Sequence, residues 1–180
     1  MRLLLRCFAL AVLVTLLHAP AARAADDDAA PGAWGPLRFL VGTWIGDMTG
    51  KPGEPVGGFS LLPALDGRIL VRKNRADYPA AADKPAYAHK DLMVVYKVPG
   101  PDSLRATYWD NEGHQIAYGV RASAGGDTVV FQTVPASGQG FRLSYVKKSE
   151  ESIDILFDIA PPAHPDAFAR YLTASAHRRK

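Results

Sequence analysis

Two histidines lie near carboxylates at spacings that suit proton transfer. Asp110 and His114 flank the turn-forming sequence Asn111-Glu112-Gly113, so a tight hairpin would bring their side chains together. A carboxylate can orient an imidazole for acid–base work. His89 precedes Asp91 by two residues, which places both on one face of a strand. His114, Asp110 and His89 are therefore candidate catalytic residues, although aspartate with a polar partner is also ordinary turn chemistry.

Other kinds of site are disfavoured by what the sequence lacks. Cys7 is the only cysteine, and it falls in a segment that we expect to be removed. No Gly-x-Ser-x-Gly nucleophile and no His-Glu-x-x-His zinc motif occurs. The histidines show no sequence-local metal spacing, so a metal site would have to assemble from distant segments. We therefore predict no metal and no resident cofactor.

Residues 1–24 have the pattern of a secretory signal peptide. Arg2 and Arg6 provide the basic start, and an apolar run from Cys7 to Leu17 follows. That run is too short to span a bilayer. Ala22-Arg23-Ala24 fits the small-x-small cleavage rule. We expect a protein exported to the periplasm or the extracellular space, with no transmembrane segment after cleavage.

Charge and composition narrow the class of partner. The 180-residue chain is 48% hydrophobic and 22% charged, which is ordinary globular composition. Residues 1–24 contain three of the 21 basic residues and none of the 18 acidic ones, so the mature chain has no net charge. Nucleic-acid binding requires a basic field, so we predict no nucleic-acid partner.

The remaining sequence predicts strands and turns. An Ala-, Gly- and Pro-rich segment at 25–35 suggests a flexible leader, and 36–40 suggests one helical turn. Thereafter, period-two patterns or short apolar runs alternate with Gly, Pro and Asp about every ten residues. The expected strands are 43–49, 56–62, 68–76, 89–97, 103–110, 114–121, 128–134, 140–147, 152–159 and 169–178. Over 36–180 we predict an all-β, ten-stranded antiparallel up-and-down barrel, since closure removes the sheet edges.

One hairpin can be placed in register. A three-residue loop at 111–113, with Gly113 in the left-handed conformation, pairs Tyr108 with Ile116 and Ala106 with Tyr118. The larger apolar residues except Trp109 then share one face. A four-residue loop would mix the two faces, so it is rejected.

The segment Phe39-Leu40-Val41-Gly42-Thr43-Trp44-Ile45-Gly46 resembles the first-strand Gly-x-Trp signature of lipocalin-like and nitrobindin-like barrels. The resemblance implies that Trp44 closes the barrel floor and that Arg178, on the last strand, stacks against it. Residues 36–179 are more similar to an uncharacterised group of small bacterial exported proteins with this calycin-like barrel. The supporting segments are Leu65–Val71, His89–Met93, Tyr108–His114, Phe157–Pro162 and Tyr171–Arg178. This resemblance implies the fold but carries no settled activity.

The resemblance also raises haem as an alternative cofactor. Nitrobindin-like barrels bind haem through a histidine on the last strand, and Tyr171 stands at the matching position here. The glycine-rich continuation after the first tryptophan is absent. Since tyrosine can ligate haem iron, Tyr171 is the candidate ligand in this alternative.

The tyrosines spread over the expected strands suit a ligand cavity, because each is apolar with one polar tip. Arg72 and Arg142 alternate with apolar neighbours and could point inward as donors. We predict that the lumen binds a small apolar or amphipathic molecule, with Arg142 anchoring its polar end. The predicted ligand-binding residues are Tyr108, Tyr118, Met93, Phe157 and Arg142. The alternatives are an envelope interaction module without a ligand, an enzyme using a His–Asp pair at the barrel mouth, and a haem protein.

Overall fold

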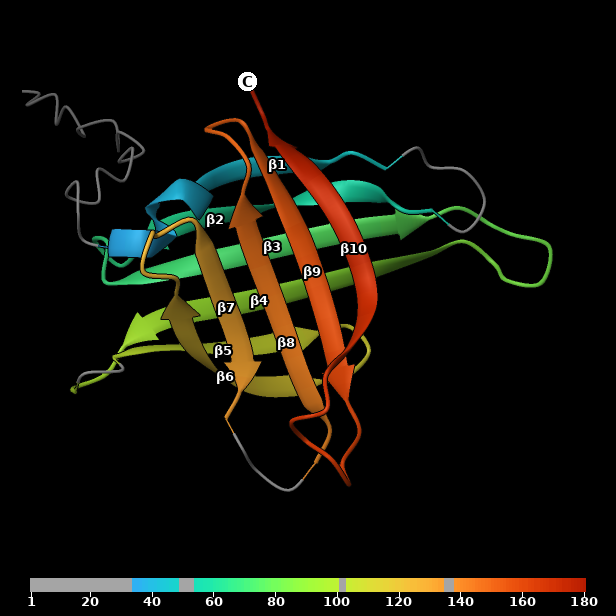
Figure 1. The fold of residues 1–180 in the computed structure, drawn as a ribbon. Coiled ribbons are helices and arrows are strands. Elements are labelled where there is room, and N and C mark those ends of the chain that lie inside the picture. The colour runs from blue at the N-terminus through green and yellow to red at the C-terminus, as the bar shows by residue number, and fades with distance from the viewer. Residues whose placement is uncertain (1–33, 49–53, 101–102, 135–137) are drawn as a thin grey trace, which may run out of the picture.

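The protein folds as a closed ten-stranded antiparallel barrel (Figure 1). The computed structural model describes residues 34–48, 54–100, 103–134 and 138–180. Each strand pairs with its neighbours in sequence, and β1 pairs with both β2 and β10, which closes the sheet. The elements are η1 (Gly35–Leu40), β1 (Gly42–Gly46), β2 (Val56–Ala64), β3 (Ile69–Tyr78), β4 (Tyr87–Lys97), β5 (Leu104–Asp110), β6 (Gln115–Ala122), β7 (Thr128–Thr133), β8 (Gly140–Lys147), β9 (Ser152–Ala160) and β10 (Ala169–Arg178). The predicted fold class is confirmed, including the short helical turn before β1.

The β5–β6 hairpin has the predicted register. Tyr108 lies opposite Ile116, and Ala106 lies opposite Tyr118. The amide of Asp110 donates to the carbonyl of His114, and Gly113 has a φ of 94°. Only a three-residue loop satisfies this pairing while keeping the apolar side chains on the inner face.

One end of the barrel is filled by side chains of η1, β1 and β2. Leu37 and Leu40 of the 3-10 helix are fully buried. Trp44 is also buried, and its Nε1 donates a 2.9 Å hydrogen bond to the carbonyl oxygen of Leu40. The ring of Phe59 stacks against the indole at a centroid distance of 6.3 Å. This end therefore has an apolar floor with its indole donor satisfied.

Arg178 stacks on the same tryptophan, which lies opposite it in the pairing of β1 with β10. Its guanidinium carbon lies 4.5 Å from the centre of the Trp44 ring, a cation–π contact. Its Nη1 and Nη2 donate to the carbonyl oxygens of Val41 and Phe39 at 2.8 and 2.9 Å. Gly42 has a φ of 134°, and a Cβ there would lie 2.5 Å from Arg178 Nη1. A glycine two residues before the tryptophan thus leaves room for the arginine.

The predicted signal peptide lies outside the described residues, as does the leader up to residue 33. Trp34 is buried, and the ammonium of Lys97 lies 5.2 Å from the centre of its ring. Trp34, which we expected in the leader, therefore packs at this end of the barrel, and Gly35 begins η1. Within the described part of the chain, no helix has the length and hydropathy needed to cross a membrane.

Candidate functional site

The barrel encloses a cavity of about 550 Å³. Its lining includes Tyr78, Tyr87 and Tyr171, which stand at strand ends away from Trp44. The cavity therefore reaches the end of the barrel opposite the floor. Its volume falls in the range of small-molecule sites, which is about 300–1,000 Å³.

One wall of the cavity is apolar. It is built by alternate residues of β8, β9 and β10, whose inward period-two positions are aliphatic or aromatic. These are Phe141, Leu143, Ile155, Phe157, Ile159, Leu172 and Ala174. The rings of Phe141 and Phe157 are nearly parallel at a centroid distance of 6.0 Å, so the two aromatic side chains pack together on this wall.

The facing wall, from β3 to the β5–β6 turn, is polar. At its base, Arg72 and Asp91 form an ion pair with side chains only 9% and 4% exposed. Asn74 Nδ2 donates a 2.8 Å hydrogen bond to Asp91 Oδ2. Burial tends to lower the pKa of Arg72, but Tyr145 and Asp91 outweigh it and raise that pKa. The arginine therefore stays charged within the barrel.

His89 joins this buried pair to the barrel mouth. Its Nε2 lies 3.4 Å from Asp91 Oδ2 and 3.2 Å from the hydroxyl of Tyr108. Its Nδ1 lies 2.9 Å from Glu112 Oε1. The expectation that His89 and Asp91 share a face is therefore met, and both line the cavity. The imidazole is held between two carboxylates.

Asp110 and His114 form a second histidine–carboxylate pair at the mouth. His114 Nδ1 lies 2.8 Å from Asp110 Oδ2, and Tyr108 donates to the same oxygen at 3.1 Å. Asp110 Oδ1 accepts the backbone amides of Glu112 and His114. The pair therefore fits both interpretations that the sequence allowed. It stabilises the turn, and it also lines the cavity.

The surroundings of Asp110 and Tyr108 determine which of these two side chains carries a proton. Partial burial tends to raise the pKa of Asp110, but hydrogen bonds from His114, Glu112 and Tyr108 hold it below its ordinary value. Burial raises the pKa of Tyr108, and the carboxylates of Asp91 and Asp110 raise it further. Asp110 is therefore an ionised acceptor at neutral pH, and Tyr108 is a donor.

Asn111 fixes the turn against β4. Its side-chain oxygen accepts the amide of Lys90 at 2.8 Å, and its Nδ2 donates to the carbonyl of Ala88 at 2.9 Å. Its own amide donates to the carbonyl of Lys90. These three hydrogen bonds attach the turn to β4 and place Glu112 beside His89. The site is therefore positioned by strands and by one turn that is fixed to them.

Of the predicted ligand-binding residues, Tyr108, Tyr118 and Phe157 line the cavity. Met93 points inward but is buried at the floor end, and it is not among the lining residues. Tyr171, the candidate haem ligand, lies at the rim, 72% exposed, with its ring edge toward Phe157.

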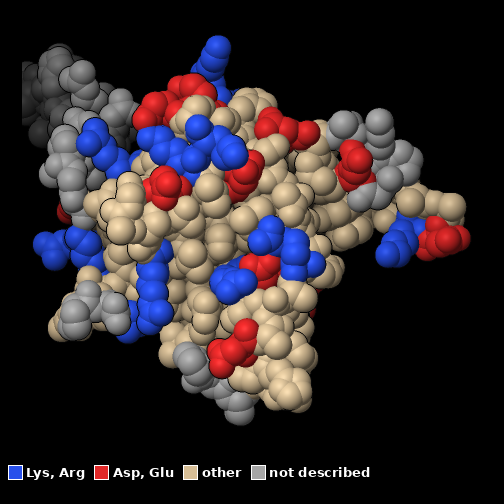
Figure 2. Space-filling model, viewed as in Figure 1, with Lys and Arg blue, Asp and Glu red and all other residues tan. Residues whose placement is uncertain are grey.

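The expectation that Arg142 points inward is wrong. Its Nε donates to Asp158 Oδ2 at 3.0 Å, and its guanidinium lies 4.3 Å from the centre of the Phe168 ring. Arg170 donates to the other oxygen of Asp158. These residues occupy the outer face of β8–β10, and Figure 2 shows basic and acidic side chains gathered side by side on this face of the molecule. Phe141 takes the adjacent inward position, and strand alternation then turns Arg142 outward.

Because Asp158 is paired with Arg142 and Arg170, we expect the protein to lose stability in acid. Burial tends to raise the pKa of Asp158, but hydrogen bonds from Arg170 and Arg142 outweigh it and lower that pKa. The stabilisation is therefore complete above the unfolded-state pKa of about 4 and disappears as the pH falls through the lower folded-state value. We expect Asp158→Asn to lower the free energy of unfolding by about 1–2 kcal/mol at pH 6. In urea titrations, the difference from wild type should narrow at pH 3; a difference that stays constant would contradict the assignment.

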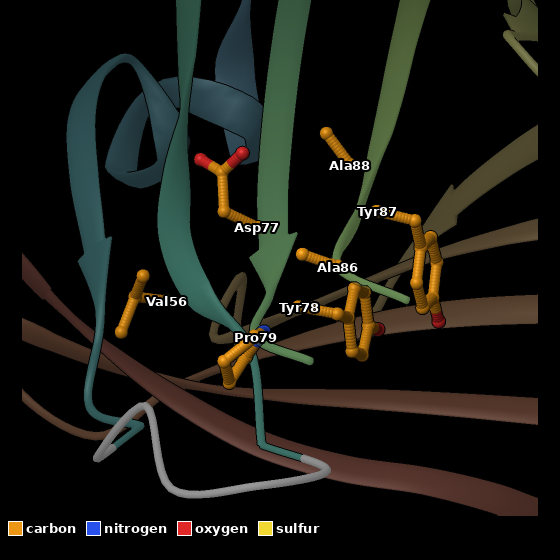
Figure 3. A pocket seen from close by; sticks show the side chains of 7 residues that line it. All are labelled: Val56, Asp77, Tyr78, Pro79, Ala86, Tyr87 and Ala88. Atoms are coloured by element: carbon orange, nitrogen blue, oxygen red, sulfur yellow. The ribbon is translucent and has the colours of Figure 1, made fainter. Parts of the chain in front are cut away.

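A second, smaller hollow lies outside the lumen at the end of the β3–β4 hairpin. Its volume is about 470 Å³, and its residues are Val56, Asp77, Tyr78, Pro79, Ala86, Tyr87 and Ala88 (Figure 3). The rings of Tyr78 and Tyr87 stack 4.4 Å apart and nearly parallel. Both tyrosines also line the main cavity, so the stacked pair forms part of its rim.

Glu112 and Asn74 are site residues that the sequence reasoning missed. Glu112 belongs to a turn, and its contact with His89 spans 23 residues, so no local pattern predicts it. The alternation of β3 could have revealed Asn74, because Arg72, Asn74 and Ala76 all line the cavity. Two polar side chains, Arg72 and Asn74, on that inner face indicate a polar wall.

The chain matches no protein-family model, and no protein of curated function is significantly similar to it.

Proposed function

We propose that this protein is an exported barrel that binds a small, mostly apolar molecule with a polar end inside its lumen. The observation that carries the proposal is the cavity of about 550 Å³ with an apolar wall facing a polar one. Small-molecule sites are typically concave and largely apolar, with a few polar groups that orient the ligand.

The two walls suggest how the ligand lies. Its apolar body would pack against β8–β10, where Phe141 and Phe157 line the cavity as a stacked aromatic pair. Its polar end would face Tyr108, His89 and His114, whose polar atoms can each donate or accept a hydrogen bond. The closed floor at Trp44 limits entry to the opposite end.

Export is part of the proposal. The basic start, short apolar run and Ala22-Arg23-Ala24 sequence support cleavage after residue 24. The mature chain would then contain no cysteine, which suits a barrel that folds without disulfides in an oxidising compartment.

A titration with N-phenyl-1-naphthylamine, an uncharged apolar dye, tests the proposal. The dye fluoresces more strongly in apolar surroundings, and we expect saturable binding of one molecule per chain. Absence of saturable binding would contradict a ligand-sized lumen. A parallel titration with haem distinguishes the haem alternative, in which Tyr171 would give a Soret band that Tyr171→Phe loses.

Catalysis at the mouth is the second candidate function. It is favoured by the 2.8 Å contact of His114 Nδ1 with Asp110 Oδ2 beside the cavity, an arrangement that can hold an imidazole for proton transfer. Once a turnover is found, we expect His114→Ala to reduce kcat by about 10²–10⁴-fold. The matched control is His177→Ala, because His177 pairs with Asp47 away from the cavity lining. Unchanged turnover in His114→Ala would eliminate this role.

A further inference from the structure

We propose that the barrel mouth binds a divalent transition-metal ion, such as Zn²⁺, through His89, Asp110 and Glu112. The three residues each offer one ligand atom, and these atoms lie within 4.8 Å of one another. They come from β4, the end of β5 and the turn that follows. The proposal does not depend on a lumen ligand, because metal binding can be measured alone.

The orientation of His89 favours a cation beside its Nδ1. Its Nε2 faces Asp91 and Tyr108, and Asp91 is itself fixed by Arg72 and Asn74. A carboxylate on one imidazole nitrogen commonly holds the hydrogen there and leaves the other nitrogen as the metal ligand. Nδ1 would then direct a lone pair toward Glu112 Oε1.

The distance between these two atoms fits a shared ion. Nδ1 and Oε1 are 2.9 Å apart. Two ligand atoms about 2.1 Å from one metal are about 3 Å apart at the right angle of an octahedral site and about 3.4 Å apart at the tetrahedral angle that Zn²⁺ prefers. A lone pair and a carboxylate oxygen at this distance need a positive charge between them, which either a proton or a metal supplies. The ion therefore requires little rearrangement of this pair.

The charge of the cavity supports a cationic occupant. Among the described lining residues, Arg72 is the one basic side chain that is always charged, and three carboxylates oppose it: Asp91, Asp110 and Glu112. Arg72 is already paired with Asp91. With neutral histidines, two negative charges are left at the mouth, and a divalent ion matches them.

The ligand types indicate which metal. One imidazole with two carboxylates suits Zn²⁺, Fe²⁺ or Mn²⁺ better than Ca²⁺, which takes six to eight oxygen ligands. His114 contacts Asp110 at 2.8 Å and offers a second imidazole beside the site. The pinned Asn111 turn and the hydrogen bond from Tyr108 to Asp110 supply the surrounding support that metal sites need.

Isothermal titration of the purified protein with Zn²⁺ tests this inference, with Ca²⁺ as the comparison ion. We expect one Zn²⁺ per chain and weaker binding of Ca²⁺. His89→Ala and Glu112→Gln should each weaken Zn²⁺ binding by at least about 10–100-fold, the range found when metal-site support is removed. The Glu112 side chain is 50% exposed, so Glu112→Gln leaves the fold intact even if His89→Ala does not.

His177→Ala is the matched control, because His177 also lies against an aspartate but does not line the cavity. Its Zn²⁺ affinity should equal that of the wild type. The inference is overturned if Zn²⁺ does not bind, if Glu112→Gln binds as tightly as wild type, or if His177→Ala abolishes binding. Titration with Co²⁺ gives an independent readout, since visible absorption bands should form in wild type and weaken in Glu112→Gln.

Discussion

Replacement of Ala174 by phenylalanine is expected to weaken binding of N-phenyl-1-naphthylamine by roughly 10- to 100-fold. Ala174 lies on β10 opposite Ile155 and lines the apolar wall, so its small side chain leaves open space in the cavity beside it. A phenyl group there would occupy that space. A ligand would have to displace the ring into strained rotamers, which costs about 1–3 kcal/mol, and each 1.4 kcal/mol is a factor of ten.

The control is the neighbouring residue on the same strand. Thr173 is exposed, its hydroxyl accepts from Arg170 on the outer face, and it does not line the cavity. Thr173→Phe adds the same ring to the outside, so dye affinity should match that of the wild type. An equal loss of dye affinity in both variants would show that the substitutions disturb the fold. Unchanged dye affinity in both variants would show that the dye binds elsewhere.

The second large effect is expected from Asp91→Ala. This change leaves Arg72 buried without its ion-pair partner, and the Arg72 Nε already has no hydrogen-bond partner within the described structure. Breaking a buried pair from one side costs about 3–5 kcal/mol, because an uncompensated charge stays in the interior. Chemical denaturation should therefore show a large fall in the free energy of unfolding.

Two further variants separate charge burial from lost packing. The double variant Arg72→Met/Asp91→Ala removes both charges and should recover much of the stability lost in Asp91→Ala. Arg75 and Asp77 form an exposed pair near the end of β3, the strand that also carries Arg72. Asp77→Ala breaks this exposed pair and should leave stability unchanged. A double variant no more stable than Asp91→Ala would contradict the role assigned to the buried charge.

The strand alternation made most of the fold predictable. Each strand of a barrel separates an apolar interior from solvent, so period-two patterns fix both its extent and its inner face. The β8–β9 pair illustrates this, since the predicted 140–147 and 152–159 differ from the observed strands by at most one residue. The same rule already disfavoured an inward Arg142, because Phe141 and Leu143 take the inward positions.

The polar wall was harder to predict, because it depends on contacts between distant segments. Asp110 and His114 are neighbours across one turn, and local turn chemistry brought them together. Glu112 reaches His89 only because Asn111 attaches the turn to β4. Burial of Arg72 requires Asp91, 19 residues later on a different strand. No local pattern specifies such pairings.

A native mass spectrum of protein purified without denaturation from an envelope fraction tests the central claim most directly. The account predicts that the wild type carries one small molecule per chain in addition to any metal, and that Thr173→Phe carries the same mass. Ala174→Phe should carry less of it or none. Identical spectra for wild type and Ala174→Phe, both showing the mass of the chain alone, would contradict a lumen that binds a ligand.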